Sequence, residues 1–172
     1  WFYGGGAGRF FPDLWRRFQD PIPEAERGNM IAAYHRRLFS DDQGRQGRYA
    51  LPWLMWENAL AGLQAAPVSH APADYARAFA RLENHYFMNG CFLSENQLLE
   101  DRHLIEHLPA VIVQGRYDMV CPPLGAHDLA QGWANCDLRI VPASGHALSE
   151  PGISAELLRV MDALRDRNQR ED

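Results

Sequence analysis

The chain has 172 residues, 47% hydrophobic and 23% charged, a composition typical of a globular protein rather than a disordered one. Its 17 basic and 22 acidic residues give a net charge of −5 and are spread along the chain, so the sequence indicates no basic surface for nucleic acid. No apolar run reaches the roughly 18 residues of a membrane span, and residues 1–20 lack the apolar region of a signal peptide.

The first residues are Trp1, Phe2 and Tyr3, without a methionine, and we expect the sequence to be a piece of a longer polypeptide. The glycine-rich residues 4–8 follow no predicted strand and fit no phosphate-binding motif, which favours a flexible connection. Three cysteines, odd in number and without C-x-x-C spacing, indicate reduced thiols and a cytoplasmic protein.

Apolar residues at 3–4 spacing predict helices at about residues 23–40, 45–63 and 74–88. The first of these has an acidic first turn, and Pro52 is expected to distort or interrupt the first turns of the second. Two prolines and several small residues predict a loop at 64–73. Asp74 is expected to cap the third helix.

Two of these helices carry a carboxylate among aromatic residues. Glu57 lies four residues after Trp53, and Glu83 lies four residues from both Phe79 and Phe87. Taken alone, each acid is interpreted as a boundary residue of an amphipathic helix. The apolar face predicted for the third helix consists of Tyr75, Phe79, Leu82 and Tyr86.

The pattern changes near residue 100. Residues 91–109 are predicted to be irregular, and a β-α-β-α pattern follows, with elements at 110–114, about 123–133, 137–142 and about 153–166. We therefore predict two domains, a helical lid at 1–100 and part of an α/β core at 101–172. Both strands are expected to be buried and parallel, and two strands do not make a stable sheet alone.

Each predicted strand is followed by a polar residue that can serve catalysis. Asp118 follows the first strand and His146 follows the second, 28 residues later, which suits a helix and a strand between neighbouring strand ends. An acid that orients an imidazole makes a general base, as in a hydrolase triad. The alternative interpretations are that Asp118 only forms a turn and that His146 is a surface or structural residue.

A triad also needs a nucleophile, and the sequence contains no Gly-x-Ser-x-Gly elbow. Cys91 follows Gly90, but no strand precedes it, so we interpret it as a small buried thiol.

Several motifs together resemble the proline iminopeptidases, serine peptidases of the α/β-hydrolase fold. The resemblance extends over nearly the whole chain and rests on segments 1–3, 6–12, 53–57, 80–87, 115–118 and 144–152. It implies that the oxyanion segment and the serine elbow precede residue 1, so that this fragment alone is inactive. It also implies that Asp118 is the triad acid and that His146 is the base.

The resemblance further implies a substrate site in the lid. Glu57 and Glu83 match the carboxylates that bind the amino end of a peptide with N-terminal proline. The pocket for the prolyl ring would include Phe2, Phe87 and Cys121. The partner would be the missing N-terminal half of the same polypeptide, and neither a cofactor nor a metal is implied, because no His, Cys and Asp cluster has ligand spacing.

Two alternative functions stay open at this point. Another lidded α/β-hydrolase, such as an esterase or an epoxide hydrolase, would use the same acid and histidine. A helical interaction module without catalysis would use the α/β tail only for stability.

Overall fold

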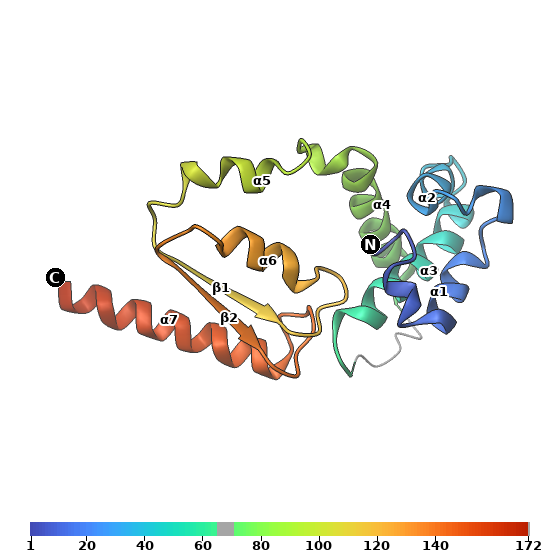
Figure 1. Ribbon diagram of the computed structural model, residues 1–172. Coiled ribbons are helices and arrows are strands. Elements are labelled where there is room, and N and C mark those ends of the chain that lie inside the picture. Colours follow the sequence, from blue (N-terminus) through green and yellow to red (C-terminus); the bar gives the residue numbers. More distant parts are fainter. Residues whose placement is uncertain (65–70, 172) are drawn as a thin grey trace. The chain divides into compact units, whose positions relative to one another are not determined.

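The computed structural model describes residues 1–64 and 71–171, which fall into two compact units (Figure 1). The units are Trp1–Ala59 with Ala65–Ser94, and Leu60–Gln64 with Glu95–Asp172. The loop predicted at 64–73 lies mostly outside the described residues. Among the described helices, none is both long and apolar enough to cross a membrane.

The first unit is helical. Its α-helices are α1 (Pro12–Gln19), α2 (Met30–Leu38), α3 (Gln43–Ala61, whose end belongs to the second unit) and α4 (Ala73–Met88). Short 3-10 turns lie at η1 (Ala7–Arg9), η2 (Glu24–Glu26) and η3 (Gly90–Phe92). The helix predicted from residue 23 is therefore broken: α2 begins after Asn29, whose side chain accepts a hydrogen bond from the Ala32 N–H at 3.0 Å.

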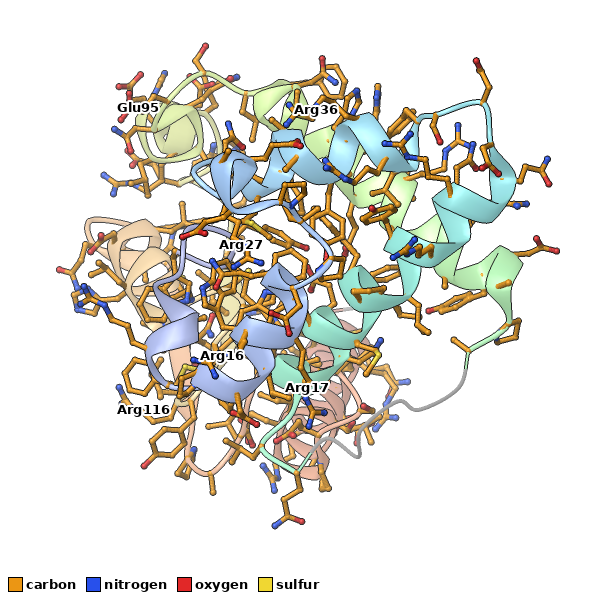
Figure 2. All side chains as sticks on the ribbon, turned by 90° about the vertical axis from the view of Figure 1, so that its right-hand side faces the viewer. Arg16, Arg17, Arg27, Arg36, Glu95 and Arg116 are labelled. Carbon is orange, nitrogen blue, oxygen red and sulfur yellow. The ribbon has the colours of Figure 1, made fainter. Side chains whose placement is uncertain are left out.

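Glu26 connects η2 to α2. Its carboxylate accepts hydrogen bonds from Nη1 and Nη2 of the buried Arg37, both at 2.9 Å. It also pairs with Arg36, whose exposed side chain is labelled in Figure 2. The acidic turn predicted to start one long helix instead binds the basic last turn of the next one.

Aromatic side chains from several segments form the core of the first unit. The fully buried members include Phe18, Tyr34, Trp53 and Trp56. The rings of Phe18 and Tyr34 stack at 4.6 Å between centroids. Burial of each such ring stabilises the fold by very roughly 1.5–3 kcal/mol. Contrary to one of the expected outcomes, Pro52 does not interrupt α3, which runs on through it.

The prediction of a flexible glycine-rich connection is wrong. The Gly6 N–H donates to the Trp1 carbonyl at 2.9 Å. A β-carbon added at Gly6 would lie 2.4 Å from the Trp1 ring, and one at Gly8 would lie 2.6 Å from the Trp15 ring. These glycines permit close packing of backbone against indole rings.

The apolar face predicted for α4 is also wrong. The buried positions are Ala76, Ala80 and Asn84, which repeat every four residues, and α4 packs on α2. Small residues on that side allow close approach, and the Asn84 amide donates to the Ile31 carbonyl at 2.9 Å. The predicted residues Tyr75, Leu82 and Tyr86 are exposed.

Two further local predictions need correction. The residue before α4 is Pro72, and Asp74 lies in the first turn, where it pairs with Arg77, so it does not cap the helix. Cys91 is exposed rather than buried.

The second unit contains the parallel strands β1 (Ala110–Gly115) and β2 (Cys136–Val141). Both strands and their parallel pairing were predicted. The register pairs Ala110 with Cys136 and Gly115 with Val141, so the strands end side by side. Burial differs from the prediction, because most strand residues are only half-buried in the described chain.

Helices flank both faces of this sheet. Figure 1 shows α6 (Pro123–Ala130) and α7 (Pro151–Glu171) on opposite sides of the two strands. Both helices contact both strands. The segment predicted to be irregular contains the short helix α5 (Gln97–Glu100) and the 3-10 turn η4 (Asp101–Leu104). The sheet therefore presents the ends of its strands, and the loops after them, at one edge.

Candidate active site

The loops that follow β1 and β2 are joined by backbone hydrogen bonds. The Arg116 N–H donates to the Val141 carbonyl at 3.0 Å, and the Tyr117 N–H donates to the Ser144 carbonyl at 2.9 Å. Gly115 permits this contact, since a β-carbon there would lie 2.0 Å from the Gly145 carbonyl oxygen. The two loops are thereby held together at the carboxyl ends of the strands.

The carboxylate of Asp118 is buried at this edge and is fully hydrogen-bonded. Its Oδ1 accepts from the N–H groups of Val120 at 3.0 Å and Cys121 at 2.8 Å. Its Oδ2 accepts from Gln114 Nε2 at 3.1 Å. Asp118 therefore shapes the turn that contains it, but one of its oxygens also faces the neighbouring loop.

That oxygen meets His146. The distance between Asp118 Oδ2 and His146 Nδ1 is 2.9 Å. The acid is 6% exposed and the imidazole is 42% exposed. In a Ser-His-Asp triad the acid binds Nδ1 and leaves Nε2 to exchange a proton with the nucleophile, and this pair has that orientation.

The two groups stabilise each other's charged forms. Burial acts to raise the pKa of Asp118, but hydrogen bonds from His146 and the Cys121 N–H hold it below its usual value. The hydrogen bond to Asp118, assisted by contact with the Cys121 thiol, raises the pKa of His146 to about 10. The arrangement therefore stabilises the imidazolium, which is the form that a general base reaches after taking a proton, and with a pKa of about 10 this charged form already dominates at neutral pH in this chain.

Residues that the sequence did not identify hold the His146 loop. The N–H groups of His146 and Ala147 both donate to the Ala61 carbonyl, at 2.9 and 2.7 Å. The Glu150 carboxylate accepts from the Gly145 N–H at 3.1 Å and the Leu63 N–H at 2.8 Å. Such contacts with backbone groups have no sequence signature, and neither has the amide of Gln114.

Glu57 and Glu83 lie in the aromatic core of the first unit. The Tyr3 hydroxyl donates to Glu57 Oε1, and Trp53 Nε1 donates to Glu83 Oε2 at 2.8 Å. Burial and the nearby carboxylates of Glu57 and Glu83 raise the pKa of Tyr3 well above its usual value. Both acids therefore act on one phenol, which means that they lie near each other.

The residues predicted to line the prolyl pocket do not all lie in the same unit. Phe2 is buried against Tyr3, with 5.0 Å between ring centroids, and Phe87 lies 5.3 Å from Tyr3. Cys121 is exposed in the second unit, where its thiol contacts His146. The predicted aromatic residues and the two glutamates thus lie in the first unit. Cys121, Asp118 and His146 lie in the second.

No set of three or more His, Cys, Asp or Glu side chains among the described residues is arranged to hold a metal ion.

Comparison with known proteins identifies close relatives. The chain is 46% identical to the proline iminopeptidase of Xanthomonas citri over 166 residues, which is 94% of this chain and 53% of that protein. It is 48% identical to the proline iminopeptidase of Arabidopsis thaliana over 92% of this chain and 43% of the relative, and 37% identical to that of Neisseria gonorrhoeae over 95% and 52%. No protein-family model matches the sequence.

The chain spans about half the length of the curated relatives that it matches. The matched half is their C-terminal part. The strand ends with Asp118 and His146, and the helices with Glu57 and Glu83, lie within the matched length. Over about nine tenths of its residues, this chain is a homologue of the C-terminal part of the proline iminopeptidases.

Proposed function

We propose that the complete polypeptide is an aminopeptidase that releases N-terminal proline from peptides by acyl transfer to a serine. The observation that carries the proposal is the 2.9 Å contact between Asp118 Oδ2 and His146 Nδ1, at the ends of two parallel strands. Relatives that bear the name proline iminopeptidase support the choice of substrate.

We assign the chain to a partial α/β-hydrolase fold. Residues 1–100 would form the helical cap, and residues 101–172 would form the last two strand-helix units of the core. The division into a helical unit and an α/β unit supports this assignment. The three free thiols support a reducing compartment, for which we propose the cytoplasm.

His146 would act as general base and then as general acid. Its Nε2 takes the proton of the serine hydroxyl as the oxygen attacks the carbonyl carbon, and it then gives that proton to the leaving amine. Asp118 holds Nδ1 protonated and stabilises the imidazolium between these two transfers. The side chain of His146 is half-exposed, which leaves part of the ring open to a group outside the second unit.

Glu57 and Glu83 would bind the substrate's amino group. Two carboxylates near each other in an aromatic, low-dielectric wall attract a cationic amine strongly. An N-acylated proline has no such charge, so the site would discriminate against it. Phe2, Phe87 and Cys121 would line the pocket for the prolyl ring.

The serine and the oxyanion donors would be supplied by the N-terminal half of the same polypeptide. The 172-residue chain alone is then expected to be catalytically silent. The test is to assay a chromogenic prolyl amide with this chain and with a version extended upstream by its own coding sequence. Only the extended protein should turn over, and a serine-directed reagent should block it.

Two further measurements sharpen this test. His146→Ala in the extended protein should abolish turnover while near-ultraviolet circular dichroism stays unchanged. A matched prolyl ester and an unrelated ester separate an aminopeptidase from a general esterase. Turnover by the short chain that resists serine reagents, or equal use of unrelated esters, would contradict the proposal.

A further inference from the structure

We infer that Tyr3 and Trp53 are positioning residues, which hold the carboxylates of Glu57 and Glu83 in place for the substrate's amino group. The inference rests on the proposed function of these two acids. The role belongs to the Tyr3 hydroxyl and the Trp53 indole N–H, and it is separate from any contact that the two rings make with substrate.

Two hydrogen bonds hold the acids, and the two donor rings are in contact with each other. The Tyr3 hydroxyl donates to Glu57, 54 residues away, and the Trp53 indole N–H donates to Glu83, 30 residues away. The two donor rings stack on each other, with 4.4 Å between centroids and 25° between planes. One stacked pair therefore connects the N-terminal segment, α3 and α4 through the two acids.

The donors themselves cannot move far. Trp53 is fully buried, and Tyr3 is 9% exposed. The Tyr3 ring also contacts Phe18 at 5.8 Å and Phe87 at 5.3 Å between centroids. A carboxylate that accepts a hydrogen bond from a fixed ring loses most of its rotameric freedom before substrate arrives, so less freedom remains to be lost on binding.

Neutral donors suit an amine site. A phenol or an indole stabilises the ionised carboxylate without cancelling its charge, whereas an arginine or a lysine would neutralise it. The ionisable groups that act on the Tyr3 hydroxyl are Glu57 on α3, Glu83 on α4 and Tyr34 on α2. A hydrogen bond from a neutral donor to each acid offsets part of the repulsion between two neighbouring carboxylates.

Replacing Tyr3 by phenylalanine tests the hydrogen bond to Glu57. Carbon NMR of the glutamate carboxyl groups should show the pKa of Glu57 rising by about 1 in Tyr3→Phe. Tyr34→Phe is the matched control, because Tyr34 is also buried in this core but its hydroxyl donates at 2.7 Å to the Phe18 carbonyl. It should cost stability and leave the pKa of Glu57 close to that of the wild type.

Replacing Trp53 by phenylalanine tests the hydrogen bond to Glu83, and the pKa of Glu83 is the quantity measured. The control is Trp56→Phe, which removes a ring of the same size and burial. Within the described chain, the Trp56 indole N–H has no hydrogen-bond partner. Trp53→Phe should raise the pKa of Glu83, and Trp56→Phe should change it much less.

Activity of the upstream-extended protein gives the second readout. In Tyr3→Phe we expect KM for a prolyl amide to rise about tenfold, with a smaller change in kcat. The acidic limb of the kcat/KM profile should move to higher pH. Tyr34→Phe should share the loss of stability without the change in KM.

The outcomes separate the inference from the proposed function. An unchanged Glu57 pKa in a folded Tyr3→Phe protein, together with an unchanged Glu83 pKa in Trp53→Phe, would overturn the inference. Raised carboxyl pKa values with an unchanged KM would support the two hydrogen bonds as the groups that hold the acids, but would overturn the proposed role of the acids in binding substrate. Raised pKa values with a raised KM would support both.

Discussion

Replacing Asp118 by asparagine perturbs one oxygen of the candidate active site while it keeps the shape of the turn. The asparagine carbonyl can still accept from the N–H groups of Val120 and Cys121, as Oδ1 does at 3.0 and 2.8 Å. The amide nitrogen replaces Oδ2, faces His146 Nδ1 and can no longer accept from Gln114 Nε2. That nitrogen donates where the carboxylate accepted, so the neutral imidazole must place its proton on Nε2 instead of Nδ1.

The expected effects follow from that exchange. The pKa of His146 should fall from about 10 toward its usual value near ~6.5, because the hydrogen bond and the charge that stabilise the imidazolium are lost. A buried charged hydrogen bond is worth about 1.5–3 kcal/mol. The imidazole is 42% exposed, so solvent screening reduces the loss of folding free energy to about 1 kcal/mol.

The raised pKa of His146 makes the stability of the fold depend on pH. The pKa of His146 is higher in the folded state than in the unfolded state, so its contribution to stability is complete below about pH 6.5 and is lost as the pH rises toward 10. Asp118→Asn should remove that alkaline decline. In the upstream-extended protein, the wrong tautomer should lower kcat by about 10⁴-fold.

Nitrogen NMR of the imidazole groups measures both the pKa and the tautomer of His146. Asp128→Asn is a suitable control, because Asp128 lies 3.4 Å from the exposed ring of His127 rather than beside His146. A His146 pKa that stays near 10 in Asp118→Asn, or that falls equally in Asp128→Asn, would show that the Asp118 carboxylate does not stabilise the imidazolium.

Three further predictions concern the surrounding structure. Gly115→Ala should lower the free energy of unfolding in urea by at least about 2 kcal/mol, because its β-carbon would meet the Gly145 carbonyl at 2.0 Å. Pairing with Arg37 and Arg36 lowers the pKa of Glu26 to about 2, so Glu26→Gln should weaken the loss of thermal stability as the pH falls from 4.5 toward 2. Glu150→Gln should speed hydrogen exchange at the Gly145 amide, since the glutamine can offer only one acceptor oxygen to the two N–H groups.

Each of these has a control in the same unit. Gly125→Ala in α6 places a methyl group in open space and should not destabilise the protein. Glu24→Gln changes an acid of the same turn as Glu26 and should leave the acid branch of the stability curve as it is. Ser154→Ala, at a hydroxyl that donates to the Leu148 carbonyl, should leave exchange at Gly145 unaffected. If a variant and its control behave alike, the corresponding contact does not have the role given to it.

Local patterns in the sequence were sufficient to place the two strands of the second unit. Short runs of β-branched residues marked β1 and β2, and the 28-residue interval between Asp118 and His146 predicted that the two side chains meet. These features depend on period and spacing, which the chain carries itself. The burial of the strands was not predictable in this way, because it depends on what covers the sheet.

The first unit was harder to predict because aromatic residues occur on more than one face of its helices. The large residues of α4 suggested one buried face, but α2 packs on Ala76, Ala80 and Asn84. Helical periodicity alone does not say which face a neighbour will choose when small residues permit closer packing. Gly6 and Gly8 were misjudged for the same reason, since their role lies in contact with Trp1 and Trp15.

The two strands, the acid and histidine that follow them, and two acids among aromatic residues could be predicted from the chain alone. The groups that hold those acids could not: they are Tyr3 for Glu57, Trp53 for Glu83, and Gln114 with two backbone N–H groups for Asp118. The physical reason is that a hydrogen-bond donor needs only to arrive within about 3 Å in the right direction. Residues far apart in the chain satisfy that condition only once packing has brought their segments together.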